Sequence, residues 1–247
     1  MVIRALLFDI NGTLTDILTN EWHDEIYRTL SNLLSYQGIL LGPEAVKAAY
    51  VQIMKEQKAA SRERYPEFDV VSIFREIIAR NATDFTHCLP PEKLEQLPLF
   101  LAETHRAASR FRLRLYNGVE ETIEQLFSKY RLAIVSDGQS AYAVPELHAV
   151  GLLDSFDPVV ISGDFGIRKP DRRLLEKALT IMQMEPPEVL FVGNDMYRDV
   201  YGARQLGIKT IFFRSNQGQQ EKEGVEPDYI IYSFPELLNA VRFFEEQ

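Results

Sequence analysis

The chain of 247 residues carries 27 Lys and Arg against 36 Asp and Glu, which gives a formal net charge of −9 at neutral pH. This balance argues against a broad nucleic-acid-binding surface, which needs clustered basic side chains, but it allows a local basic pocket for one phosphate. Its length suggests one or two domains, and 46% hydrophobic residues supply enough apolar material for a full core.

Two features predict a cytoplasmic protein that does not associate with a membrane. Cys88 is the only cysteine, so no internal disulfide can form, as is usual in a reducing compartment. The apolar run near the start is too short to span a bilayer and lacks a small-residue cleavage site, and no other run is long enough. We interpret residues 2–8 as a β-strand.

A long helical block is predicted after this first strand. Between residue 16 and about residue 111, apolar residues recur at helical spacing, as Ile26, Leu30 and Leu34 do. Proline-containing turn signals divide the block into four or five expected helices. We interpret residues 16–111 as an all-helical insertion, a second domain or cap, and we expect Trp22 to lie in its core.

The rest of the chain alternates between short apolar runs and amphipathic segments. The expected strands are 2–8, 132–135, 158–161, 189–192, 210–213 and 229–232. The expected helices between most of them are 119–130, 140–150, 171–184 and 197–207. Such alternation predicts an α/β fold, with a Rossmann-like parallel sheet covered by helices on both faces. Residues 1–15 and 112–247 would form this core domain.

Polar side chains suited to chemistry follow three of the expected strands. The carboxyl ends of parallel strands meet at one edge of a sheet, where α/β proteins bind their ligands. Carboxylates and a hydroxyl that converge there could hold a hard cation such as Mg²⁺, which favours oxygen ligands. The residues concerned are Asp9, Ser136, Asp137, Asp195 and, one turn later, Asp199.

Lys169 is expected at the same edge. Pro170 and Asp171 are typical of a helix start, which places Lys169 on the loop just before that helix. A lysine among carboxylates can neutralise charge and hold a phosphoryl oxygen. Gly12 and Gly138 favour close approach of the backbone to a phosphate, because no side chain intervenes.

Four segments, in this order, resemble the motifs of the haloacid dehalogenase (HAD) superfamily of hydrolases. They are residues 8–14 (FDINGTL), 134–138 (IVSDG), 168–171 (RKPD), and 192–195 (VGND) together with Asp199. Residues 115–119 are similar to the segment where the family's chain re-enters its core, and the helical insertion stands where members with a type-one cap carry it. The resemblance covers essentially the whole chain.

The resemblance implies a Mg²⁺-dependent hydrolase that acts on a small phosphorylated compound. Asp9 would be the nucleophile and form an aspartyl-phosphate. Ser136 and Lys169 would hold the transferring phosphoryl group, since such catalysis is mostly positioning and charge neutralisation. The implied substrate-binding residues are Gly12, Thr13, Ser136, Asp137, Gly138 and Lys169.

The resemblance also implies a set of metal ligands. They are Asp9, the backbone carbonyl of Asn11, the carboxylate of Asp195, and Asp199 either as a ligand or behind one. Asn194 stands where many members have the first acid of the fourth motif, so it remains an alternative to Asp195.

Position 11 departs from the family's pattern. Family phosphatases have an aspartate there that protonates the leaving group and later activates water, whereas this chain has Asn11. An amide has no titratable proton near neutral pH, and general acid–base help is typically worth about 10²–10⁴-fold in rate. The catalytic set Asp9, Asn11, Ser136 and Lys169 therefore predicts a weakened proton transfer.

Three functions remain open from the sequence. The first is a phosphatase, similar to phosphoglycolate phosphatases, that prefers substrates with good leaving groups. The second is a 2-haloacid dehalogenase, which also uses an aspartate nucleophile and needs no acid at position 11, although those enzymes lack a metal. The third is a phosphate-ligand-binding protein with little or no turnover.

Overall fold

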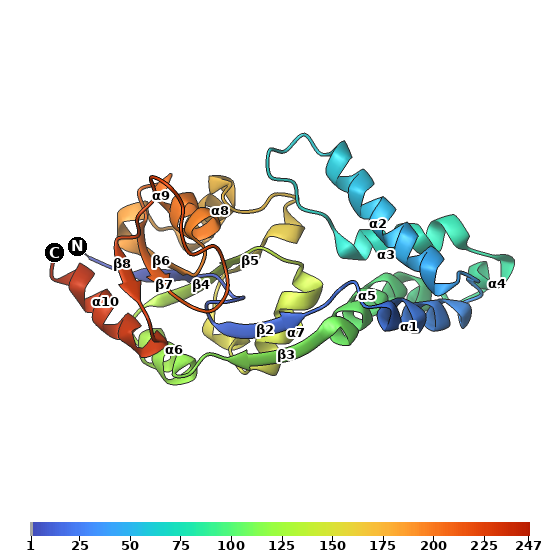
Figure 1. Ribbon diagram of the computed structural model, residues 1–247, viewed down its shortest axis with the longest axis horizontal. Helices are drawn as coiled ribbons and strands as arrows, with labels where there is room; N and C mark the ends of the chain where they lie inside the picture. The colour runs from blue at the N-terminus through green and yellow to red at the C-terminus, as the bar shows by residue number, and fades with distance from the viewer. Residues whose placement is uncertain (1) are drawn as a thin grey trace.

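The fold is built on a six-stranded parallel sheet in the order β5-β4-β1-β6-β7-β8 (Figure 1). The computed structural model describes residues 2–247. The strands are β1 (Ala5–Phe8), β4 (Arg131–Ser136), β5 (Val159–Ile161), β6 (Val189–Gly193), β7 (Lys209–Phe213) and β8 (Tyr229–Ile231). The predicted α/β fold with a parallel sheet is confirmed, and each expected strand is present.

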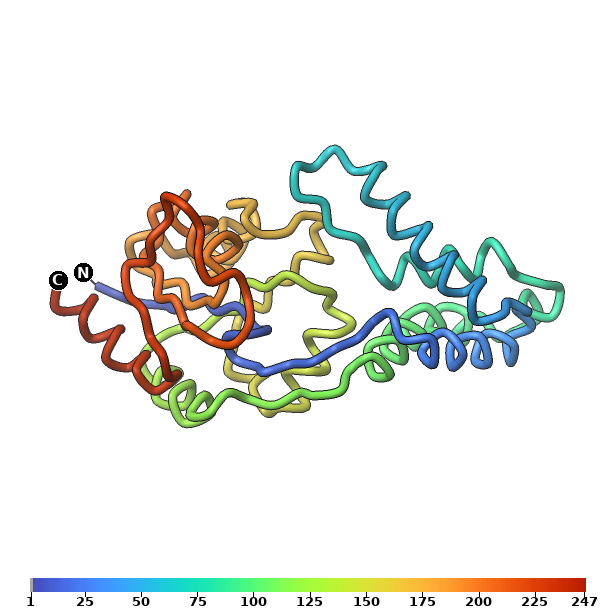
Figure 2. Tube along the Cα trace, in the orientation of Figure 1, coloured from blue at the N-terminus to red at the C-terminus, as the bar shows by residue number. Residues whose placement is uncertain are grey.

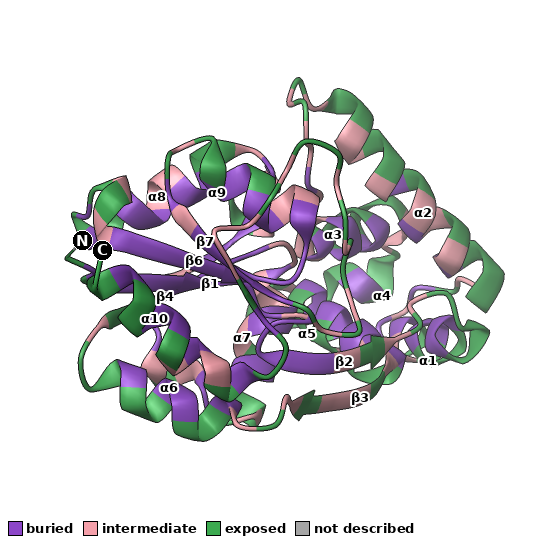
Figure 3. Ribbon diagram, turned by 60° about the vertical axis from the view of Figure 1, so that its left-hand side comes forward, coloured by how far each residue is buried: buried purple, intermediate pink, exposed green. Residues whose placement is uncertain are grey.

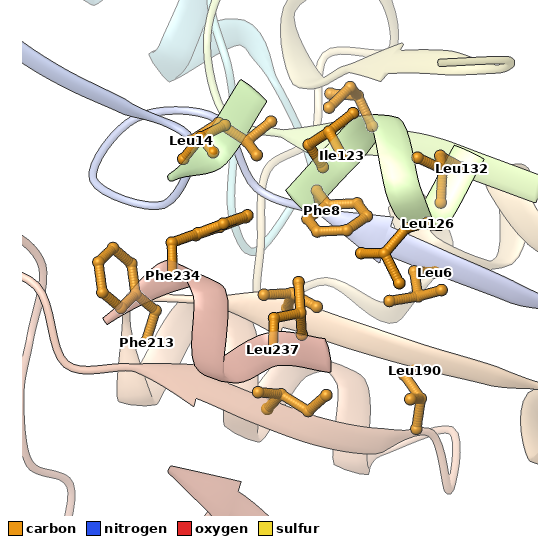
Figure 4. Close-up of a cluster of buried hydrophobic side chains, with 14 of the residues drawn as sticks. Leu6, Phe8, Leu14, Ile123, Leu126, Leu132, Leu190, Phe213, Phe234 and Leu237 are labelled. Atoms are coloured by element: carbon orange, nitrogen blue, oxygen red, sulfur yellow. The ribbon is translucent and has the colours of Figure 1, made fainter. Parts of the chain in front are cut away.

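The central strand β1 is buried on both faces, as a strand covered by helices on both sides must be. Leu6 and Phe8 point to one side and pack in the cluster of Figure 4, and Phe8 meets Phe156 edge-on at 5.7 Å between ring centroids. Ala5 and Leu7 belong to a second cluster on the opposite face. Because β1 pairs with β4 on one side and with β6 on the other, the residue that follows it lies in the middle of the carboxyl edge of the sheet.

Helices cover the two faces of the sheet (Figure 3). The first face is covered by α6 (Val119–Phe127), α7 (Ser140–Ala149) and α10 (Leu237–Glu245). The second is covered by α8 (Arg172–Met182), the π-helical turn Met196–Tyr201 and the short α9 (Gly202–Arg204). Short 3₁₀ turns lie at Leu153–Ser155, Ser162–Asp164, Pro186–Glu188 and Phe234–Glu236. The expected helix at 197–207 therefore begins as a π-helix. The helix α10 was not among the helices expected from the sequence.

Residues of the inserted block form five helices, four of which share a hydrophobic cluster that Tyr142 of α7 also joins. They are α1 (Asp24–Ser35), α2 (Pro43–Ala60), α3 (Val70–Asn81), α4 (Asp84–His87) and α5 (Pro91–Ser109). Figures 1 and 2 show these helices to one side of the sheet, and we call them the cap. The expectation that Trp22 is a core residue was wrong, because it is 51% exposed and precedes α1. The boundary at residues 16 and 112 remains a prediction.

The block is not helical throughout, and this expectation was wrong at both ends. Strand β2 (Thr15–Thr19) pairs antiparallel with β3 (Arg110–Leu115) and forms a ribbon that leads into and out of the cap. Residues 110–115 read RFRLRL, an alternation of charged and apolar residues that is typical of a strand. Arg112 and Arg114 of this strand bind the buried Asp16 of its partner at 2.7 and 2.8 Å.

Along residues 2–247, none of the helices is both long and apolar enough to cross a membrane.

Candidate active site

Asp9 lies directly after β1, at the carboxyl edge of the sheet. Its backbone N–H continues the ladder to β6 by donating to the carbonyl of Val192 at 3.0 Å. Its Oδ1 accepts hydrogen bonds from Ser136 Oγ at 2.8 Å and from Lys169 Nζ at 2.7 Å. The fold therefore brings together the three side chains that the sequence predicts for nucleophilic attack and phosphoryl binding, each from a different strand end or loop.

Lys169 is a fully enclosed cation. Its residue is 3% exposed, and its ammonium donates to Asp199 Oδ1 at 2.6 Å as well as to Asp9. Burial lowers the pKa of Lys169, but the nearby carboxylates of Asp199, Asp9 and Asp137 outweigh it and raise that pKa above its ordinary value. The lysine is therefore protonated near neutral pH and can offset negative charge.

Asp199 holds Lys169 from behind. Its Oδ2 accepts from the backbone N–H groups of Asn194 and Asp195, both at 3.0 Å. Burial raises the pKa of Asp199, and the Lys169 ammonium opposes this rise. Because one oxygen is bound by Lys169 and the other by two amides, Asp199 acts as a fixed support for the lysine and the fourth motif.

Asp195 has both carboxylate oxygens engaged. Its Oδ1 caps the π-helical turn by accepting from the N–H groups of Tyr197 and Arg198, and its Oδ2 accepts from Gln219 N and from Arg198 Nε at 2.9 Å. Burial raises the pKa of Asp195, but these amides and the Arg198 guanidinium outweigh it and leave that pKa below its usual value. The carboxylate is thus ionised at neutral pH and already paired with a positive charge.

The loop after Asp9 packs closely on Asn194. Gly12 has a φ of +87°, and a Cβ there would lie 2.2 Å from Asn194 Nδ2, so only glycine fits. Thr13 is fully buried and its hydroxyl donates to Asn194 Oδ1 at 3.0 Å, which leaves Thr13 no exposed surface for the substrate contact predicted above. Asn11 turns its side-chain oxygen to the hydroxyl of Thr15 at 3.1 Å.

A cavity of about 220 Å³ opens beside these residues, between the sheet edge and the cap. Its volume lies below the usual range for sites that enclose drug-sized ligands, so it suits a small one. The core residues on its wall include Asn11, Ser136, Asp137, Gly138 and Arg168. The cap and its connecting ribbon add Glu21, Glu67, Phe68 and Arg106.

Several charged residues of this cavity wall were not identified as site residues from the sequence. Arg106 is buried and binds Glu146 through two nitrogens, at 2.7 and 3.1 Å, and also binds Glu21 at 3.0 Å. Arg168 stands 3.4 Å from the Asp137 carboxylate, and Asp137 in turn accepts from the N–H of Lys169. Arg168 neighbours the predicted lysine, which is a usable signal, whereas nothing local in the sequence marks Arg106 or Glu67.

The comparisons with known proteins agree on one family. A model of haloacid dehalogenase-like hydrolases matches residues 6–213. A glyceraldehyde 3-phosphate phosphatase of Methanothermobacter thermautotrophicus is 27% identical over 91% of this chain and 92% of its own length. The pyrophosphatase PpaX of Halalkalibacterium halodurans is 30% identical over 67% and 78%. A glyceraldehyde 3-phosphate phosphatase of Pyrococcus furiosus is 32% identical, but the match spans only 55% of its length and 52% of this chain.

Solved structures agree with the fold. A 2-haloacid dehalogenase from Pseudomonas syringae has a TM-score of 0.70 at 18% identity, covering 98% of this chain and 100% of its own. A HAD phosphatase from Thermococcus onnurineus has a TM-score of 0.59 at 23% identity, covering 97% and 98%. At these identities the likeness concerns the fold and does not choose between the two reactions.

Proposed function

The chain belongs to the haloacid dehalogenase-like hydrolase family, and we propose that it is a Mg²⁺-dependent phosphatase that uses Asp9 on a small phosphorylated metabolite. The observation that carries this proposal is the shared oxygen of Asp9, to which both Ser136 and Lys169 donate. A nucleophile held beside a hydroxyl and a cation suits phosphoryl transfer, which depends on positioning and charge neutralisation. Three similar proteins are phosphatases by name, among them a phosphoserine phosphatase of Thermus thermophilus.

Asp9, Ser136 and Lys169 would divide the work of the first half-reaction. The Asp9 carboxylate attacks phosphorus and forms an aspartyl-phosphate, which water then hydrolyses. Ser136 and Lys169 exchange part of their bonding with Asp9 for the phosphoryl oxygens. Since Lys169 is buried and already charged, it needs no proton and little rearrangement to stabilise the charge that develops there.

The donor chemistry of the site fits Mg²⁺. Mg²⁺ is commonly held by one or two carboxylates with waters and substrate phosphates rather than by a full cage of side chains. No cluster of three or more His, Cys, Asp or Glu side chains placed to hold a metal occurs within residues 2–247. The carboxylates of Asp9 and Asp195 and the backbone carbonyl of Asn11 would be the ligands, with Asp199 behind them. Bound there, Mg²⁺ would supply positive charge for the phosphoryl oxygens.

The small cavity and the amide side chain of Asn11 restrict the range of expected substrates. A volume of about 220 Å³ suits a short phosphorylated acid or sugar, and phosphoglycolate is one candidate. Because Asn11 cannot donate a proton to the leaving group, acyl and aryl phosphates, whose leaving groups need little protonation, are expected to react faster than alkyl phosphates.

Dehalogenation of a 2-haloacid is a second candidate that one observation favours. The Arg198 guanidinium binds Asp195 at 2.9 Å, so a positive charge already stands at one of the expected metal ligands. A halide leaving group also needs no proton from position 11. Halide release from 2-haloacids that a chelator does not diminish would favour this function over ours.

A phosphatase screen with and without Mg²⁺, run in parallel on Asp9→Ala, tests the proposal. We expect phosphate release from at least one small phosphoester, lost with EDTA and lost in the variant. Release that survives in Asp9→Ala would come from another source and overturn the proposal. Tight binding of phosphorylated ligands with no turnover across the panel would instead indicate a binding protein.

A further inference from the structure

Glu67 is a buried carboxyl group that the mechanism above does not use. It lies on the segment between α2 and α3 of the cap, and its side chain is 3% exposed. It nevertheless stands on the wall of the cavity that Asn11, Ser136 and Gly138 also line. The cap thus brings an ionisable acid to the cavity whose core wall lacks one at position 11.

Backbone contacts on both sides hold Glu67 against the core. Its N–H donates to the carbonyl of Gly166 at 3.0 Å, and the N–H of Arg168 donates to the carbonyl of Tyr65 at 3.0 Å. Pro66 and Ile167 form an antiparallel bridge between these segments. Figure 2 shows the cyan segment after α2 beside the loop that precedes α8. Main-chain hydrogen bonds therefore hold the backbone that carries the Glu67 carboxyl against the core.

Gln139 adds a second attachment on the other side of Glu67. Its side-chain oxygen accepts from the N–H of Val70 at 2.9 Å, and its nitrogen donates to the carbonyl of Phe68 at 2.7 Å. Gln139 follows Gly138 in the second motif and is 5% exposed. The segment that carries Glu67 is thus tied to the same loop that presents the predicted phosphate contact.

One hydrogen-bonded hydroxyl links Glu67 to that phosphate contact. Ser162 Oγ donates to Glu67 Oε2 at 3.0 Å and accepts from the N–H of Gly138 at 2.9 Å. Glu67 Oε1 accepts from the N–H of Phe68 at 3.2 Å. The Ser162 hydroxyl therefore bridges the Glu67 carboxyl group and the amide of Gly138, which the resemblance assigns to the phosphoryl group.

The charges that face Glu67 come from two elements of the core. Arg168 Nε, on the loop before α8, lies 3.8 Å from Glu67 Oε2, and Asp137, after β4, adds a negative charge. Burial raises the pKa of Glu67, Asp137 raises it further, and Arg168 opposes the rise. The net result is a pKa above the ordinary value of a glutamate, so the carboxyl keeps its proton to higher pH than an exposed one.

We propose that Glu67 is the general acid–base of this hydrolase, supplied by the cap in place of the carboxyl that position 11 lacks. This proposal rests on the phosphatase function proposed above. It assigns the proton to a cap residue on the wall of the cavity, whereas the nucleophile Asp9 follows a strand of the core. Proton transfer to an alkoxide leaving group then requires the cap segment to be docked on the core.

The two proton transfers balance as follows. An Asp9 oxygen bonds to phosphorus, the bond from phosphorus to the leaving oxygen breaks, and that oxygen takes its electron pair together with the proton of Glu67. A water oxygen then bonds to the phosphorus of the aspartyl-phosphate and gives a proton to the Glu67 carboxylate. The bond to Asp9 breaks, which releases inorganic phosphate and restores both side chains.

A leaving-group comparison of Glu67→Gln with wild type tests the assignment. We expect kcat/KM for an alkyl phosphate to fall by about 10²-fold or more, because the alkoxide must leave without its proton. We expect kcat/KM for p-nitrophenyl phosphate, which reports formation of the aspartyl-phosphate and not its hydrolysis, to change by less than about threefold, because nitrophenolate leaves unprotonated. Glu63→Gln is the matched control, since Glu63 lies on the same segment and pairs with Arg173 outside the cavity. Its activity should be unchanged.

Two further measurements separate a proton donor from a structural contact. In wild type, kcat/KM for the alkyl phosphate should fall as pH rises through the pKa of Glu67, and Glu67→Gln should lose this alkaline limb. In the Asn11→Asp background, which regains a core acid, the effect of Glu67→Gln should shrink by about tenfold or more.

The outcomes distinguish the two proposals. Equal losses of kcat/KM on alkyl and aryl phosphates, with the alkaline limb retained, would overturn the role of Glu67 while leaving the phosphatase in place. Absence of any phosphate turnover that depends on Asp9 in wild type would overturn the phosphatase itself. If Glu67→Gln does not fold, Glu67→Asp takes its place: it keeps the carboxyl but retracts it, so a loss confined to the alkyl substrate supports the proposal and an equal loss overturns it.

Discussion

The ammonium of Lys169 lies 2.7 Å from Oδ1 of Asp9, and neither side chain is more than 10% exposed. The same nitrogen lies 2.6 Å from Asp199, so that a single buried cation is shared by two carboxylates. Removal of one partner from such a cluster leaves uncompensated charge in a low-dielectric interior. A substitution in this cluster can therefore change both the free energy of unfolding and the catalytic rate, and each residue can be tested for both effects.

Lys169→Met should destabilise the protein and abolish turnover. Two buried carboxylates would lose their counter-charge, which typically costs about 3–5 kcal/mol of unfolding free energy. Urea unfolding measures this loss. The double variant Lys169→Met, Asp199→Asn should recover part of the stability because one carboxylate is neutralised, but none of the activity. An unchanged unfolding midpoint in the single variant would contradict the buried ion-pair cluster.

Asp9→Asn should separate chemistry from folding. The amide keeps the shape of the side chain, and Lys169 retains its bond to Asp199, so we expect a folded protein with an unfolding midpoint near that of wild type. Without the nucleophile, phosphate release should fall to background, a loss of about 10³-fold or more. Rapid quench with a ³²P-labelled substrate should trap labelled protein in wild type and none in Asp9→Asn.

Asn11→Asp should raise turnover of an alkyl phosphate. The new carboxyl restores an acid at the position where family phosphatases carry one, and we expect a gain of about tenfold or more. Values of kcat/KM for an alkyl phosphate and for p-nitrophenyl phosphate give the comparison, since the aryl substrate should gain little in formation of the aspartyl-phosphate. No gain on the alkyl substrate would mean that position 11 does not limit the reaction.

Arg198→Gln should strengthen Mg²⁺ binding. The guanidinium binds Asp195 and stands 4.0 Å from Asp137, so it competes with a divalent ion for the same carboxylate. Removal of this competing charge is expected to lower the apparent Kd about three- to tenfold, which corresponds to roughly 1 kcal/mol. The rise of Tm with Mg²⁺ concentration measures the affinity without any assay of activity. Arg172→Gln, an exposed change on α8, is the control, and equal Mg²⁺ titrations for all three proteins would contradict the competition.

Asp16 should make the ribbon that leads into the cap sensitive to acid. Burial raises the pKa of Asp16, but hydrogen bonds from Arg114 and Arg112 outweigh it, so the pKa in the folded protein lies below its ordinary value. A depressed pKa stabilises the folded state above the unfolded pKa of about 3.9, and this stabilisation is lost as pH falls through the lower folded value. Asp16→Asn should therefore lower Tm at pH 7 and have a progressively smaller effect below about pH 4. A Tm difference independent of pH would contradict this assignment.

The sequence by itself determined the sheet and the residues at its edge. Strands of a parallel sheet are buried on both faces, so they appear as continuous apolar runs, and β1, β4 and β6 could be located before any contact was known. The polar residue that directly follows each strand must then stand at the carboxyl edge. Asp9 and Ser136 were placed together for this reason, because their positions follow from local pattern and from sheet geometry alone.

The tertiary structure alone decided what the cap contributes. The ribbon of β2 and β3 pairs residues almost a hundred positions apart, and its pattern competes locally with that of the neighbouring helices. Glu67 reaches the cavity through main-chain contacts to a loop about a hundred residues further along the chain. Such placements depend on packing between distant segments, which the pattern of any one segment does not specify.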